Sequence, residues 1–179
     1  MATIVDELKA DHDRLRCMLR AFEKELDRFE QGEDADIQLM ADITEHYGEY
    51  FTRVHHPTED RLFEDLMRQG VPEAEGTEEA ETQHAELIAS TATLQARLDE
   101  VLHNQIVDRV GLVTAGRRYL ELNRTHMDHE EATIFAWARE RLDNMAWPAL
   151  DARRAYDESP DQLQYTEKLK NEVERYAVE

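Results

Sequence analysis

Apolar residues recur every three or four positions along four long stretches of the chain. This spacing places side chains on one face of an α-helix, so each stretch is predicted to form an amphipathic helix. Short segments that contain Gly, Pro or Asn separate the stretches. The predicted helices cover residues 2–30, 35–68, 76–102 and 105–142.

Short connections make consecutive helices antiparallel neighbours. Residues 1–142 are therefore predicted to be all-α, an antiparallel up-and-down four-helix bundle. After Asn144 the apolar pattern weakens, although the segments near Pro148 and after Pro160 keep a helical character. We expect residues 143–179 to form a short C-terminal helical extension, packed on the bundle or at an oligomer contact. The length of 179 residues suits one domain with such an extension.

Ionisable residues interrupt all four apolar stripes. Each stripe contains a histidine, and two stripes also contain a glutamate four residues later, which gives the set His12, His55, Glu59, His84, His126 and Glu130. Burying such groups is costly unless they find partners. One core histidine is usually a hydrogen-bonded packing residue, but the same feature in four stripes indicates a common cause.

The four histidines are predicted to lie at similar levels of the bundle. His12 lies 18 residues before the end of the first predicted helix, and His55 lies 20 residues after the start of the second. His84 lies 18 residues before the end of the third helix, and His126 lies 21 residues after the start of the fourth. At about 1.5 Å of rise per residue, the mismatches in an antiparallel bundle are a few ångströms. All four helices can therefore bring ligands to one layer.

A metal centre explains this layer. Imidazoles and carboxylates without thiolates suit iron, manganese or zinc. The six residues are too many for one tetrahedral zinc ion, and they suit two metals bridged by Glu59 and Glu130. His56 is a further candidate ligand, because Pro57 is expected to kink the helix and could turn both His55 and His56 toward the metals.

The segments around these residues resemble the hemerythrin-like, or HHE cation-binding, domains. The resemblance covers residues 1–142 and rests on ADHDRLR around His12, HHPTEDRLF from 55 to 63, TQHAEL around His84 and HMDHEEATIF from 126 to 135. It implies a four-helix bundle around two non-haem Fe ions, bridged by carboxylates and an oxo or hydroxo group. Zn or Mn are the substitutes that the ligand types allow.

Two departures distinguish the chain from the oxygen-carrying hemerythrins. The oxygen carriers have two histidines four residues apart on the third helix. In this chain, the positions four residues before and after His84 are Ala80 and Ile88. Their fourth-helix carboxylate is an aspartate five residues after the histidine, whereas Glu130 lies four after His126. The pattern is more similar to the iron- and oxygen-responsive HHE proteins, with His56 in place of the missing imidazole.

The resemblance implies a di-iron protein that binds or senses O2, NO or peroxide, or senses iron itself. The alternative is an enzyme, either a di-iron oxidase or peroxidase or a two-metal hydrolase. A purely structural bundle with buried histidines is the third hypothesis.

Composition limits the partners. The net charge of −20, from 21 basic and 41 acidic residues, disfavours nucleic acid and anionic membranes. The single cysteine, Cys17, cannot form an internal disulfide and is expected to be a packing residue. The N-terminus has no signal-peptide pattern, so a cytoplasmic location is expected, with a homodimer left open.

The remaining histidines and nearby side chains have simpler interpretations. His46 and His103 are expected at the surface, and His129 there or next to a ligand. The aromatic residues near the layer, Phe51, Tyr47 and Tyr119, are expected in the core. The carboxylates that flank the ligands either orient imidazoles or face solvent, and they are Asp11, Asp13, Asp60 and Glu131.

Overall fold

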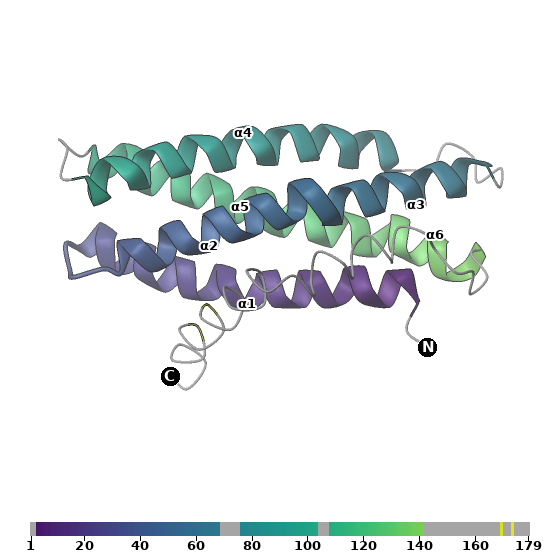
Figure 1. Cartoon of the computed structure of the whole chain (residues 1–179), viewed down its shortest axis with the longest axis horizontal. Helices are drawn as coiled ribbons and strands as arrows, with labels where there is room; N and C mark the ends of the chain where they lie inside the picture. The colour runs from purple at the N-terminus through teal and green to yellow at the C-terminus, as the bar shows by residue number, and fades with distance from the viewer. Residues whose placement is uncertain (1–2, 69–75, 104–107, 142–168, 170–172, 174–179) are drawn as a thin grey trace.

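Helices that lie side by side make up the part of the chain that the computed structural model describes, residues 3–68, 76–103 and 108–141 with Leu169 and Val173 (Figure 1). In chain order they are α1 (Ile4–Gln31), α2 (Ile37–Tyr50), the π-helical turn η1 (Phe51–His55), α3 (His56–Arg68), α4 (Thr77–Leu102), α5 (Arg109–Ala132) and α6 (Ile134–Arg141). Helix α1 packs against α2 and α5, and α4 packs against the same two helices. The expected all-α bundle is confirmed.

Polar caps set the helix ends that the sequence predicted. Thr3 and Asp6 form a reciprocal capping box at the start of α1, and Gly32 ends that helix with φ of 79°. Asp36 caps α2 by accepting from the backbone of Leu39. Asp108 caps α5 in the same way. The observed ends lie within a few residues of the predicted ones because these local signals are strong.

The second predicted helix contains a π-helical turn at the expected kink. Pro57 has no backbone N–H, so it cannot complete the α-helical hydrogen-bond ladder. The N–H of His56 bonds to the carbonyl of Phe51, five residues earlier. The hydroxyl of Thr58 donates to the carbonyl of Val54 at 2.6 Å. The proline is therefore accommodated by a local widening of the helix, and His55 and His56 at its end are both buried.

The fourth predicted helix is divided, which the sequence pattern did not predict. The N–H and the hydroxyl of Thr133 both donate to the carbonyl of His129, at 3.0 and 2.7 Å. The chain turns there, and α6 continues toward α1 and α3. The turn brings Phe135 over the imidazole of His12, with ring centroids 5.3 Å apart.

A polar layer lies between two apolar clusters of the described residues. On α1, His12 lies between Leu8 of the smaller cluster and Leu15 of the larger one. Leu169 and Val173 are buried in the larger cluster. The other residues of the predicted extension 143–179 lie outside the described part of the chain. Within that part, no helix is long and apolar enough to span a membrane.

Candidate metal centre

The seven predicted ligands come from every long helical segment. α1 supplies His12, η1 ends at His55, and the remaining side chains are His56 and Glu59 on α3, His84 on α4, and His126 and Glu130 on α5. All seven side chains are buried. The structure brings them together in the polar layer, as the predicted levels required.

The first group consists of His12, His55, Glu59 and Glu130. One nitrogen or oxygen atom from each lies within 4.8 Å of the others. Nε2 of His55 is 2.9 Å from Oε1 of Glu59, and Nε2 of His12 is 3.4 Å from Oε2 of Glu130. These atoms lie close enough together to bind one metal ion.

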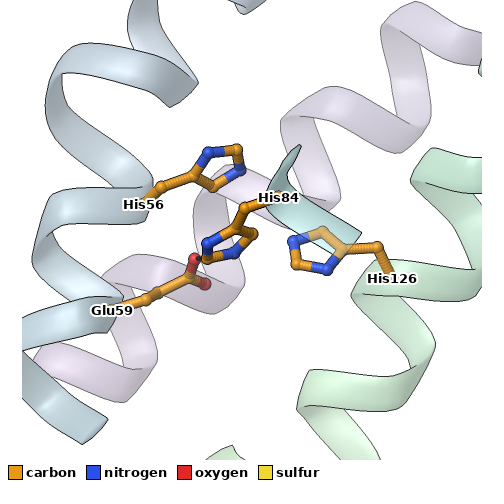
Figure 2. A group of neighbouring side chains, drawn as sticks. All are labelled: His56, Glu59, His84 and His126. Carbon is orange, nitrogen blue, oxygen red and sulfur yellow. Dashed lines mark ion pairs between the residues drawn. The ribbon is translucent and has the colours of Figure 1, made fainter. Parts of the chain in front are cut away.

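The second group consists of His56, Glu59, His84 and His126, which also offer atoms within 4.8 Å of one another. Figure 2 shows the three imidazoles reaching the same region from α3, α4 and α5, with the Glu59 carboxylate beside them. The rings of His56 and His84 are stacked, with centroids 3.9 Å apart. Oε2 of Glu59 is 3.5 Å from Nε2 of His84.

Both glutamates face both groups. Glu59 is a member of each group, with Oε1 toward His55 and Oε2 toward His84. Glu130 contacts His12 of the first group, and Nε2 of His126 in the second group lies 3.3 Å from its Oε2. The two carboxylates are therefore placed between two neighbouring clusters of ligand atoms.

Carboxylates outside the layer fix the histidines of the first group. Nδ1 of His55 donates to Asp11 at 2.9 Å, and Nδ1 of His12 donates to Glu131 at 3.1 Å. A carboxylate only accepts at neutral pH, so Nε2 of each ring is left to bind a proton or a metal. The two Nε2 atoms face each other at 3.1 Å, which is too close for both to carry a proton.

Each of these carboxylates is itself held. Glu131 accepts from Lys9 at 2.9 Å and from Arg16 at 2.7 Å. Its hydrogen bond with His12, followed by those with Arg16 and Lys9, holds the pKa of Glu131 far below its usual value. The other carboxylate, Asp11, is buried and accepts from Arg14 and from the hydroxyl of Tyr50.

The histidines of the second group have weaker outer partners. Nδ1 of His126 lies 3.2 Å from Oε1 of Gln83, and Nδ1 of His84 is 3.8 Å from Asp60. Sequence reasoning missed Gln83 because it lies one position before His84 and off the apolar face of α4. It also missed the role of Tyr50. Periodicity identifies the inward residues, and it carries no signal for the partners around them.

Protonation balances the carboxylates when no metal is bound. Burial opposes a charge on His55, but Glu59 and Asp11 overcome it and raise the pKa of His55 to about 10. Burial likewise opposes a charge on His84, but the nearby carboxylates of Glu130 and Glu59, 3.4 and 3.5 Å from its Nε2, raise its pKa to about 9. Protons on these rings therefore occupy positions that metal ions would take.

The other histidines of the second group remain neutral. Burial lowers the pKa of His126 to about 4 and holds the pKa of His56 well below its usual value. Burial alone would raise the pKa of Glu59 and Glu130, yet the neighbouring histidines keep both carboxylates ionised. The metal-free layer thus combines protonated and neutral imidazoles with two buried carboxylates, whose negative charge metal cations can offset in place of the protons.

Unpartnered polar atoms test whether these residues fit a metal. Among the described residues, the buried side-chain nitrogen and oxygen atoms without a hydrogen bond are Nε2 of His56, His84 and His126 and both oxygens of Glu59 and Glu130. Leaving such atoms unsatisfied is costly. Ligands at right angles on one metal, with bonds of about 2.1 Å, lie about 3 Å apart. The observed separations and the donor types therefore fit bound metal ions.

The other histidines are accounted for by local contacts. The expectation of a surface His46 is wrong, because its ring is buried edge-on against Tyr47 and burial lowers its pKa. His103 is exposed, as expected. His129 lies 3.1 Å from the carbonyl of Gly76 at the start of α4. The expected core positions of Phe51, Tyr47 and Tyr119 are confirmed.

A comparison with known protein families places this geometry in context. The family model of the hemerythrin HHE cation-binding domain matches residues 3–138. Searches of curated proteins and of solved structures found no match. The match spans the bundle and all seven residues of the layer. The chain therefore belongs to the hemerythrin HHE cation-binding domain family and is a metal-binding protein.

Proposed function

We propose that the protein holds two iron ions in the polar layer and binds or senses a small molecule such as O2, NO or peroxide. The observation that carries this proposal is the presence of two buried ligand groups with two glutamates between them. One metal ion would not need seven ligands, and two cations offset two buried carboxylates and allow neutral histidines around them.

The geometry suggests how the ligands divide. His12 and His55 would bind one iron, and the second group's three histidines, His56, His84 and His126, would bind the other. Glu59 and Glu130 would contact both. The first iron then has fewer protein ligands, so it keeps more coordination positions for a small molecule.

The protein's own residues would position the ligands and limit solvent. Asp11 and Glu131 hold Nδ1 of the two first-group histidines, so each Nε2 stays directed inward. Phe135 covers His12, and apolar clusters lie on both sides of the layer. When bound, iron supplies reversible redox chemistry and open coordination positions, which the protein tunes through these contacts.

An oxidase or peroxidase acting on an organic molecule is the second candidate. It is favoured by a cavity of about 490 Å³ that includes His56 among its lining residues. Turnover of peroxide in the presence of a reducing organic substrate would support this candidate. A hydrolase is less favoured, because the described lining residues include no Lys or Arg to bind an anionic leaving group.

Elemental analysis of the purified protein tests the main proposal. We expect about two irons per chain, with near-ultraviolet absorption in air that is lost on reduction. The double variant E59Q/E130Q should lose most of the iron. The matched control E64Q/E121Q changes two exposed glutamates on the same helices, α3 and α5, and should keep it. A folded protein that takes up no iron, or a double variant that retains it, would overturn the proposal.

A further inference from the structure

A cavity of about 490 Å³ lies between α2 and α4 and reaches the polar layer. Its lining includes the exposed residues Thr52 and Ile88 and also the buried residues Tyr119 and His56. The cavity therefore runs from the helix surface to a member of the metal-ligand set. Its volume lies within the range of small-molecule binding sites and far exceeds what a diatomic molecule needs.

Small residues on the facing helices create this space. Gly48 on α2 and Ala92 on α4 both line the cavity. A Cβ atom at Gly48 would lie only 3.1 Å from the side chain of Thr91 on α4. Gly48 therefore lets α2 and α4 approach closely at this point, and the small side chain of Ala92 leaves the adjacent space of the cavity open.

The buried part of the lining is aromatic and carries neutral polar groups. The rings of Tyr47 and Phe51 contact each other with centroids 5.8 Å apart, and Tyr119 contributes a third ring. Burial raises the pKa of both tyrosine hydroxyls, so each remains able to donate and accept a hydrogen bond. The amide nitrogen of Asn123 already donates to the carbonyl of Tyr119 at 2.8 Å. These groups suit a flat ligand that carries a hydroxyl group.

The charges on the lining select against anions. Glu45, Glu49 and Asp99 line the cavity, and none of the described lining residues is Lys or Arg. Glu49 pairs with Arg53, which is outside the lining, at 3.1 Å. A carboxylate or phosphate ligand would meet these acidic side chains and find no cation on the described lining itself, whereas a neutral ligand needs none.

We propose that this cavity binds a neutral aromatic molecule with a hydroxyl group and holds it beside His56. The binding follows from the cavity and its lining alone. Its position next to a metal ligand rests on the function proposed above, and it would bring an organic molecule to the side of the centre that carries three histidines.

Calorimetric titration of the full chain with phenol and with benzoate tests the proposal. Phenol should bind with a dissociation constant in the millimolar range, as expected for so small a ligand. Benzoate has the same ring with a negative charge and should bind at least about tenfold more weakly. Absence of phenol binding, or equal binding of benzoate, would overturn the inference.

Iron content measured in the same samples separates this inference from the proposed function. A protein with two irons per chain that binds no phenol would overturn only the cavity proposal. A protein that binds phenol in the expected way but takes up no iron would overturn only the iron proposal.

Two substitutions on α4 locate the binding site. Ala92 and Ala96 are both exposed on α4, but only Ala92 lines the cavity. A92W should weaken phenol binding at least about tenfold by filling the cavity, and A96W should leave it unchanged. Equal effects of the two, or an unaffected A92W, would contradict the assignment. Circular dichroism checks that both variants remain helical.

The double variant Y47F/Y119F gives an independent measure, because it removes only two hydroxyls from the lining. Phenol affinity should fall about fivefold if either hydroxyl bonds to the ligand. Unchanged affinity would overturn the proposed recognition of a hydroxyl group.

Discussion

The two ligand groups are built from the same residue types but are supported differently. In the first group, His12 and His55 donate to the carboxylates Glu131 and Asp11, at 3.1 and 2.9 Å. Arginine, lysine and tyrosine side chains hold these carboxylates in turn. The first group is therefore held in place by charged contacts before any metal binds.

The second group has neutral or distant outer partners. His126 meets the amide of Gln83, and His84 lies 3.8 Å from Asp60. Nε2 of His56, His84 and His126 has no hydrogen bond among the described residues. The lining of the cavity also includes His56. The first group is therefore held in place without a metal, whereas the second has fewer contacts that hold it and borders the cavity.

Removing the metals should produce the largest effect. Ligand binding at about a thousand times the dissociation constant stabilises a protein by about 4 kcal/mol, so the metal-free chain should melt roughly 10 °C lower. Amides near His84 and His126 should exchange hydrogen at least about tenfold faster, with a smaller change near His12. Calorimetry and hydrogen exchange measure both effects. A larger change in hydrogen exchange near His12 than near His84 and His126 would contradict the conclusion that the first group is held in place without a metal.

The next largest effect should come from substitution of the residues that contact the histidines from outside the layer. This effect should differ between the two groups. D11N removes the charge that fixes His55 and should weaken iron binding about 10- to 100-fold. Q83L removes a neutral partner of His126, so we expect a loss of less than about tenfold. Competition with a chelator, read by iron content, gives both values. Equal losses would show that the charged contacts have no special importance.

The pH dependence of the stability of the metal-free chain should differ between the histidines whose pKa is raised and those whose pKa is lowered. The pKa of His55 is raised to about 10 and that of His84 to about 9, so the stability that these two histidines contribute is present below pH 6.5 and is lost as the pH rises toward 9 and 10. The pKa of His126 is lowered to about 4, so its contribution is present above pH 6.5 and is lost as the pH falls toward 4. Melting temperatures should fall by roughly 5 °C in each direction. The melting temperature of the metal-loaded protein should change less with pH above pH 6.5, because metals replace the protons.

The smallest effect is expected from substitution of His129, which lies close to His126 in sequence but outside the layer. His129 contacts the carbonyl of Gly76, which joins α5 to the start of α4. H129A should lower the melting temperature by roughly 2–4 °C, as expected for one hydrogen bond, and should leave the iron content unchanged. Loss of iron in this variant would place His129 among the ligands and enlarge the second group.

The bundle could be predicted from the sequence because its signals are local and repeated. Apolar spacing located the four helical segments, and caps such as Asp36 and Asp108 fixed their ends. The division at Thr133 had no such signal, because threonine is compatible with a continuous helix and its hydroxyl bond to His129 has counterparts at Thr82 and Thr93 within the uninterrupted helix α4. The kink at Pro57 was foreseen, whereas its π-helical form was not.

The inward residues of the centre could also be predicted, because burying charge in four stripes demands a common partner. The residues that contact these side chains from outside the layer could not be predicted. Gln83 and Tyr50 reach the layer from positions that carry no periodic signal. His46 was misplaced for a related reason, since a polar residue type alone does not reveal that a neighbouring ring covers it.

Anomalous X-ray diffraction from crystals of the iron-loaded protein tests the central claim most directly. We expect two iron peaks in the polar layer, one next to His12 and His55 and the other next to His56, His84 and His126, with Glu59 and Glu130 touching both. A single peak, or iron bound outside this layer, would contradict a two-metal centre built on the two shared glutamates.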